Sequence, residues 1–275
     1  MDLTFTLTEI ALLVGGLVVA SILAGLIAGL LGVGGGIVLV PVMFWLFTFI
    51  DFPEAIAAHM AVATSLATIV FTSISSMRAH HARGAVDFKL LRSWGPALAV
   101  GALSGGLAAR YFESGVLTGV FGVVGLLVAI NLAIPRTLVI AAHLPHPAIQ
   151  GVIGVIIGFI SSLMGIGGGT LGVPTLAAFS YPIHRAVGTA AAFGFVIALP
   201  AAIGFIVSGW DVPGRPPLSL GYVSLAAALI ILPFTVGFAP LGARLAHALQ
   251  PIWVKRAFAL FLVLTAIKMI HSTLT

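Results

Sequence analysis

Two long apolar stretches of the chain are interrupted by GVGGG at residues 32–36 and by GIGGG at residues 165–169, which we call the first and second glycine runs. Each run is followed at the same distance by a proline, Pro41 in one case and Pro174 in the other. Glycine adopts positive φ without steric cost, so a glycine run frees the backbone from helical geometry. In lipid, such a break is tolerated only where protein or a water-filled cavity surrounds it. The runs therefore predict two broken helices inside the molecule.

The composition is that of a membrane protein. Of the 275 residues, 60% are hydrophobic and 7% are charged, whereas soluble chains carry roughly 25% charged residues. Stretches almost free of charge, such as Ile10–Leu31 and Gly115–Ile134, reach the roughly 20 residues needed to cross about 30 Å of hydrocarbon. We therefore expect an all-α polytopic membrane protein embedded in a lipid bilayer.

Ten hydrophobic segments follow one another along the chain. They cover residues 9–31, 37–50, 54–77, 93–111, 115–135, 148–164, 170–181, 186–207, 219–241 and 251–271. Two of them, 37–50 and 170–181, directly follow the glycine runs and are too short to cross a bilayer comfortably. We expect these two to be half-helices or the second arms of re-entrant hairpins.

The two halves of the chain align as repeats. Matching positions occur in the same order in both halves: the glycine runs with their prolines, Phe52-Pro53 with Tyr181-Pro182, residues 61–64 with 186–189, and residues 107–110 with 241–244. The sequence predicts a first repeat over residues 1–136, a connector over 137–147 and a second repeat over 148–275. Each repeat holds five segments, an odd number, so simple alternation turns the second repeat upside down relative to the first.

Loop charges favour this inversion. The loop at 78–92 carries several basic residues and one acid, Asp87, whereas its counterpart at 208–219 carries Arg215 and Asp211. In the next pair of loops the excess of basic residues lies in the second half: the loop at 242–256 carries several of them, whereas its first-half counterpart carries only Arg110 and Glu113. By the positive-inside rule, both basic loops and the connector face the cytoplasm. Both termini are then extracytoplasmic, and the acidic start of the chain does not resemble a signal peptide.

The glycine runs are the first candidates for a binding site. Matched breaks in the two halves of a hydrophobic chain are typical of a transporter's binding site. Backbone N–H groups at the start of a half-helix, together with the positive end of its dipole, bind anions. The candidate donors are Gly34, Gly35, Gly36, Gly167, Gly168 and Gly169. The alternative is that small residues only let helices pack tightly, although three adjacent glycines spread around a helix instead of forming one face.

Side chains near the runs supply further candidates. Hydroxyls of the repeated segment could donate to a bound oxyanion, or could bond helix carbonyls instead. The candidates for substrate binding are Thr64, Ser65, Thr189 and His59, of which the histidine could equally be a packing residue. The hydroxyls that we interpret as structural are Thr68, Thr72 and Ser73. The candidates for a gating or structural role are Pro41, Pro174 and Arg185.

The residue inventory excludes several classes of protein. Cysteine is absent, and no Asp or Glu lies at the centre of a hydrophobic segment, so thiol chemistry and a carboxylate proton relay have no support. Adjacent His80 and His81 cannot both face one metal ion on a helix. Neither glycine run continues as a Walker phosphate loop, and the net charge of +5 belongs to loops, not to a nucleic-acid-binding face. We expect no enzyme, no metal, no cofactor and no nucleic-acid partner.

The succession of motifs resembles one known family. In order come residues 29–41 around the first glycine run, 61–66 (AVATSL), 83–87 (RGAVD), 164–174 around the second run, and 184–189 (HRAVGT). This resembles the sulfite exporter family of the TauE/SafE type, over nearly the whole chain. The resemblance implies a carrier in the bacterial plasma membrane for small sulfur-containing anions such as sulfite, organosulfonates or thiosulfate. The second repeat has Ala190 where the first has Ser65, so one hydroxyl is lost.

The resulting hypothesis is a secondary transporter that moves a small sulfur-containing anion by alternating access. Two alternatives stay open at this stage. One is a transporter of another small solute, and the other is a non-transport membrane subunit that docks a partner through the 78–92 loop. The oligomeric state is not encoded in any feature of the sequence.

Overall fold

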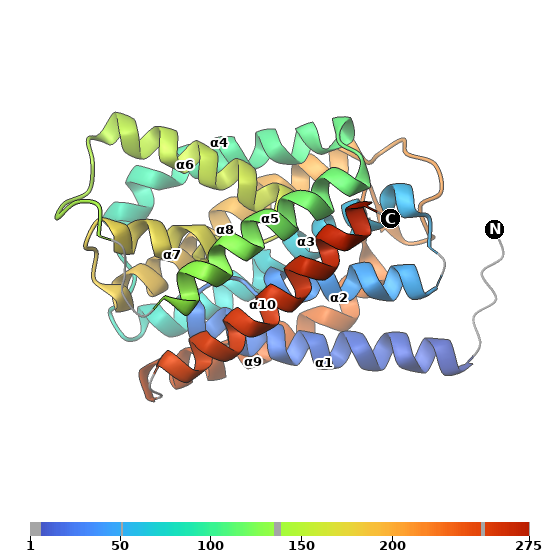
Figure 1. Ribbon diagram of the computed structural model, residues 1–275, viewed down its shortest axis with the longest axis horizontal. Coiled ribbons are helices and arrows are strands. Elements are labelled where there is room, and N and C mark those ends of the chain that lie inside the picture. The colour runs from blue at the N-terminus through green and yellow to red at the C-terminus, as the bar shows by residue number, and fades with distance from the viewer. Residues whose placement is uncertain (1–6, 51, 135–138, 249–250, 275) are drawn as a thin grey trace.

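The computed structural model describes residues 7–50, 52–134, 139–248 and 251–274 and is a bundle of α-helices (Figure 1). The helices of the described residues are α1 (Leu7–Leu31), α2 (Gly36–Phe49), α3 (Glu54–His81), α4 (Phe88–Ala108), α5 (Ser114–Ala133), α6 (Pro147–Met164), α7 (Gly169–Ala178), α8 (Ile183–Ser208), α9 (Leu225–Ala248) and α10 (Pro251–Leu274). A 3₁₀ turn, Ala109–Tyr111, follows α4. Each hydrophobic segment of the sequence corresponds to one α-helix, which confirms the all-α class.

One predicted boundary is wrong. The segment expected at 219–241 begins with a small antiparallel hairpin, β1 (Ser219–Leu220) and β2 (Val223–Ser224), and helix α9 starts only after it. Gly221 at the turn has a φ of +56°, which favours glycine. Ser224 then caps α9, because its Oγ accepts a hydrogen bond from the Ala227 N–H at 3.3 Å. The apolar residues of the hairpin made it look like the first turn of a helix.

Helices α3 and α8 form the centre of the bundle. Among the described helices, six are long and apolar enough to cross a membrane. In α3 and α8, 83% and 61% of the most apolar window is buried inside the protein, against 33–39% in the other four spans. The two central helices pack against each other and are surrounded by the rest. Helix α2, with 14 residues, and α7, with 10, are too short to span the bilayer.

The packing partners follow one pattern in both halves of the chain. Helix α1 packs against α9 and α6 packs against α4, while α5 packs against α10. Likewise α2 lies against α3, and α7 lies against α8. Each pairing in the first half therefore has its counterpart in the second when α1–α5 are exchanged with α6–α10. From the glycine runs, α2 and α7 extend toward opposite ends of the bundle (Figure 1).

The loops gather at the two ends of the bundle. At one end, the segment after α3 meets the segment before α8, since the Tyr181 hydroxyl donates to Asp87. At the other end, the turn after α4 meets the hairpin and the start of α3, where His59 contacts Tyr222. The start of α1 and the end of α10 are both at this second end of the bundle (Figure 1). Most of the expected connector, including residues 139–146, is irregular, and residues 135–138 lie outside the described residues.

Candidate binding site at the glycine runs

The two glycine runs meet in the interior of the bundle. All of their residues are buried. The Gly167 N–H donates to the Val33 carbonyl at 3.2 Å, and a Cβ placed on Gly34 would lie 3.1 Å from the Gly167 Cα. The breaks that the sequence places 133 residues apart are thus in direct backbone contact.

Close packing and backbone conformation both require glycine here. Positive φ values occur at Gly32 (+70°), Gly34 (+76°) and Gly35 (+86°), a region that side chains disfavour. A Cβ on Gly36 would overlap the Gly165 carbonyl oxygen. Close packing and backbone conformation therefore explain why glycine occupies these positions.

The glycine runs end at two helix starts without side-chain caps. Gly35 precedes α2 and Gly168 precedes α7, and within the described residues neither start receives a side-chain hydrogen bond. In α7 the first helical bond runs from the Gly172 N–H to the Gly168 carbonyl at 2.8 Å. The N–H groups of the preceding turn have no acceptor within the helix. These N–H groups and the helix dipole place positive potential inside an apolar bundle.

Two buried hydroxyls lie beside the second glycine run. Ser73 on α3 and Thr170 in the first turn of α7 are 1% and 2% exposed, and neither side-chain oxygen has a hydrogen-bond partner within the described residues. A Cβ on Gly194 of α8 would overlap the Ser73 Oγ and lie 3.8 Å from the Gly168 nitrogen. Ser73 therefore lies close to the uncapped start of α7.

These hydroxyls correct part of the sequence interpretation. The structural role is confirmed for Thr68, which donates to the Ser65 carbonyl at 2.7 Å, and for Thr72, which donates to the Thr68 carbonyl at 3.0 Å. The sequence grouped Ser73 with them, yet its Oγ has no such partner among the described residues. Thr170 was not expected at all, although its hydroxyl directly follows the glycine run and is replaced by Ile37 in the first repeat.

Thr64 and Thr189 occupy equivalent positions. The Thr64 Oγ1 accepts a hydrogen bond from the Ser224 N–H, and the Thr189 Oγ1 accepts one from the Asp87 N–H, both at 2.9 Å. Ser224 and Asp87 are the residues immediately before α9 and α4. The two threonines thus join the central helices to the starts of α9 and α4. An accepting hydroxyl keeps its own proton, so each can still donate.

Ser65 and His59 have different surroundings. The Ser65 Oγ donates to the Gly165 carbonyl at 2.7 Å and so ties α3 to the second glycine run. The His59 Nε2 lies 3.1 Å from the carbonyl oxygens of both Ala109 and Phe112, and its ring stacks on Tyr222 at 4.7 Å. His59 is therefore part of the closure at one end of the bundle, which favours the packing role that the sequence left open.

The opposite end is closed by a polar cluster around Asp87. One carboxylate oxygen accepts hydrogen bonds from the Tyr181 hydroxyl at 2.6 Å and from Arg185 at 3.0 Å. The other accepts from the N–H groups of Lys89 and Leu90 and so caps α4. The hydrogen bond from Tyr181 holds the pKa of Asp87 below its usual value. Burial, and then the hydrogen bond to Asp87, raise the pKa of Tyr181 to about 12.

Pro41 and Pro174 lie inside the short helices. A proline removes the N–H that would bond the carbonyl four residues earlier. Helix α2 nevertheless continues beyond Pro41 to Phe49, and α7 continues beyond Pro174 to Ala178. Neither proline therefore ends its helix.

Fold and site together define an all-α polytopic membrane protein with two broken helices, an architecture found in secondary transporters. The sulfite exporter TauE/SafE family matches residues 17–269, and the chain belongs to this family. A probable membrane transporter protein of Haemophilus influenzae is 37% identical and covers 96% of this chain and 98% of its own. Probable membrane transporter proteins of Bacillus subtilis (YunE) and Methanocaldococcus jannaschii are each 27% identical, over 93% and 88% of this chain. No solved structure gives a significant match. The protein is thus a membrane transporter and not an enzyme.

Proposed function

We propose that the protein carries a small sulfur-containing anion, such as sulfite, an organosulfonate or thiosulfate, across the bacterial inner membrane. The family name points to this class of substrate. The observation that carries the proposal is the uncapped start of α7, beside which lie two buried hydroxyls with no hydrogen-bond partner among the described residues. A sulfur oxyanion presents several acceptor oxygens and would satisfy both kinds of donor.

The anion would bind where the glycine runs meet. Backbone N–H groups of Gly34–Gly36, Gly168 and Gly169 would supply positive potential without a charged side chain. The Gly167 N–H, a further candidate from the sequence, donates to the Val33 carbonyl and would instead hold the two runs together. Ser73 and Thr170 would donate to the oxygens directly. Of the other candidates, Thr64 and Thr189 keep protons that they could donate, whereas the Ser65 hydroxyl donates to the Gly165 carbonyl and would hold the second run in place. Neutral donors hold an anion less tightly than an arginine would, which suits a carrier that must also release it.

Two inverted repeats would provide the alternating access. The exchangeable packing partners of α1–α5 and α6–α10 support this, as do the opposite directions of α2 and α7 (Figure 1). The repeats would be residues 1–136 and 148–275, joined by a cytoplasmic connector at 137–147. The end that carries Asp87 and Arg185 would face the cytoplasm and both termini the exterior. Opening would alternate between the Asp87 cluster and the His59–Tyr222 contact.

Tracer flux in reconstituted vesicles tests the proposal. Sulfite, sulfoacetate and thiosulfate are compared with a neutral solute of similar size. We expect Ser73→Ala and Thr170→Val to weaken anion uptake, while the control Thr72→Val, whose hydroxyl bonds its own helix, transports normally. Equal effects of all three substitutions would assign the hydroxyls to packing. Uptake of the neutral solute alone, or no uptake of any solute, would favour one of the two alternatives.

A further inference from the structure

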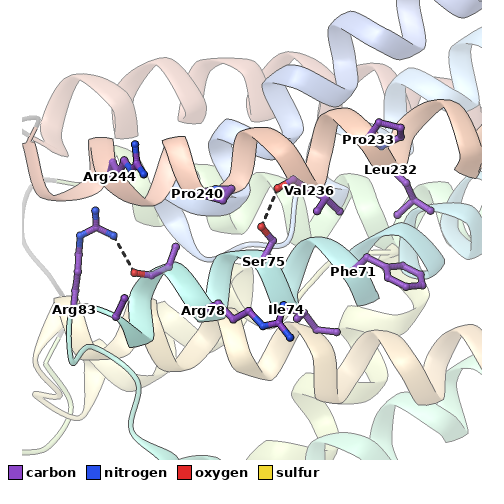
Figure 2. Close-up of a pocket in the computed structure, with 12 residues that line it drawn as sticks. Phe71, Ile74, Ser75, Arg78, Arg83, Leu232, Pro233, Val236, Pro240 and Arg244 are labelled. Atoms are coloured by element: carbon purple, nitrogen blue, oxygen red, sulfur yellow. Dashed lines mark hydrogen bonds between the residues drawn. The ribbon is translucent and has the colours of Figure 1, made fainter.

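A groove lies between α3 and α9, away from the glycine runs, with a volume of about 960 Å³ (Figure 2). Its walls carry apolar side chains at one end, including Phe71 and Leu232, and arginines at the other, Arg83 and Arg244 (Figure 2). Arg78 also lines the groove, and no Asp or Glu is among the described residues that line it. The groove is therefore amphipathic, with all of its charge of one sign.

The repeat comparison explains why a groove forms between α3 and α9. In the other half, α4 and α8 pack closely at Gly106 and Gly204, where a Cβ on Gly204 would lie 2.9 Å from the Gly106 Cα. The repeat alignment, with offsets of 134 and 125 residues, places Pro240 and Ala79 at the two equivalent positions. Both of these residues line the groove. These two bulkier residues leave α9 and α3 less closely packed than α4 and α8.

The floor of the groove is held in a defined geometry. Pro240 has no N–H, so the Val236 carbonyl lacks its helical partner four residues later. The Ser75 hydroxyl of α3 donates to this carbonyl at 2.9 Å and ties the two helices together across the groove (Figure 2). An unsatisfied carbonyl facing lipid would be costly. The hydrogen bond therefore fixes the separation of α3 and α9 at the groove.

The dimensions fit one leaflet of a bilayer. Leu232 and Arg244 are 12 residues apart on α9, which at about 1.5 Å per residue is roughly 18 Å. Half of the hydrocarbon core measures about 15 Å. The arginine end therefore falls near the headgroups when the apolar end reaches toward the bilayer centre.

We propose that this groove binds an anionic phospholipid of the cytoplasmic leaflet. Its phosphate would contact Arg83 and Arg244, with Arg78 as a third positive charge, and one acyl chain would lie along Phe71 and Leu232. Arg83 and Arg244 are exposed, and guanidinium groups suit a phosphate. The Arg83 Nη1 also donates to the Ala79 carbonyl at 2.9 Å, and the other N–H groups of this side chain remain for the phosphate (Figure 2). Basic pockets between helices on the cytoplasmic side recognise such headgroups. A small inorganic anion would leave the apolar wall unused.

Mass spectrometry of lipid retained by the purified protein in detergent tests the site. The protein is incubated with phosphatidylglycerol or phosphatidylcholine. We expect preferential retention of phosphatidylglycerol, reduced about fivefold for each arginine removed in Arg83→Gln and Arg244→Gln. Arg110→Gln is the matched control, because Arg110 is the repeat counterpart of Arg244, lies outside the groove and stacks over Tyr111 at 5.5 Å. It should retain the lipid as the unaltered protein does.

A second variant separates the groove from its charge. Ala79→Trp fills the groove and leaves all three arginines, and it should also release the lipid. Equal retention of both lipids, or unchanged retention in the arginine variants, would overturn the proposal. Displacement of the lipid by sulfite or inorganic phosphate would instead assign the groove to a water-soluble anion. None of these readouts depends on transport, so the result stands apart from the flux experiment.

Discussion

Substituting Gly36 by alanine is the most direct test of the contact between the glycine runs. The added Cβ would overlap the Gly165 carbonyl oxygen and lie 2.8 Å from the Ser65 Oγ and 2.9 Å from the Ile69 Cδ1. Overpacking by one carbon costs about 1–3 kcal/mol in a close-packed interior. Because the first obstacle is backbone and not a flexible side chain, we expect a loss of about 3 kcal/mol at the upper end of that range.

The same substitution at Gly15 is the matched control. Gly15 lies in α1 and is exposed, and a Cβ placed on it would meet no atom within 4 Å outside its own helix. Alanine there removes the entropic disadvantage of glycine and should stabilise the helix by about 0.5–1 kcal/mol. The two glycine-to-alanine changes are therefore predicted to have opposite signs.

Thermal unfolding of the purified protein in detergent measures both changes. At about 2–4 °C per kcal/mol for a chain of this size, Gly36→Ala should lower the Tm by roughly 6–12 °C and Gly15→Ala should raise it by about 1–4 °C. A Gly36→Ala protein that melts within a degree of the unaltered protein would refute the backbone contact between the runs. A similar loss at Gly15 would show that the effect is not specific to that contact.

Three further predictions concern the Ser65 hydrogen bond, the Asp87 cluster and the membrane topology. Ser65→Ala removes the hydrogen bond to the second glycine run and should lower the free energy of unfolding by about 0.6–1.7 kcal/mol, measured in the same melts. The cluster at Asp87 should be intact at neutral pH and lost as the pH falls through the lowered pKa of this carboxyl, so acid should increase labelling of a cysteine introduced nearby. Tyr181→Phe should move that transition to higher pH, and an unmoved transition would remove the hydrogen bond as its cause. Cysteines at Lys89 and Arg215 should be labelled from opposite sides of the membrane, and labelling from one side would contradict the inverted topology.

Hydropathy predicts most of this fold because an apolar segment in lipid must satisfy its backbone N–H and C=O groups internally, which an α-helix does. The short α2 and α7 were expected because each follows a glycine run, and a glycine run interrupts a helix. The hairpin before α9 was not expected, since Val223 is as apolar as the helix that follows. Each of its strands has only two residues, which is too short to show the alternation of apolar and polar residues that identifies a strand.

The candidate site was predictable only in part. The glycine runs and Thr64 with Thr189 stand out because they repeat, and the structure does bring the members of each pair to equivalent places. Ser73 and Thr170 do not repeat, so alignment of the halves gives them no weight. Whether a hydroxyl bonds its own helix or remains unpartnered depends on rotamer and neighbours. Thr72 and Ser73 are adjacent in sequence and differ in this respect.

The contact between the glycine runs also constrains how the chain can evolve. A Cβ on Gly36 meets the Gly165 carbonyl, and one on Gly169 meets the Gly32 carbonyl. The requirement for glycine in each half is thus imposed by the backbone of the other half. Substitutions at these positions are penalised together, even though the halves have drifted apart elsewhere. If the two halves arose by gene duplication, their sequences would stay most alike at the glycine runs, where the two halves are in contact.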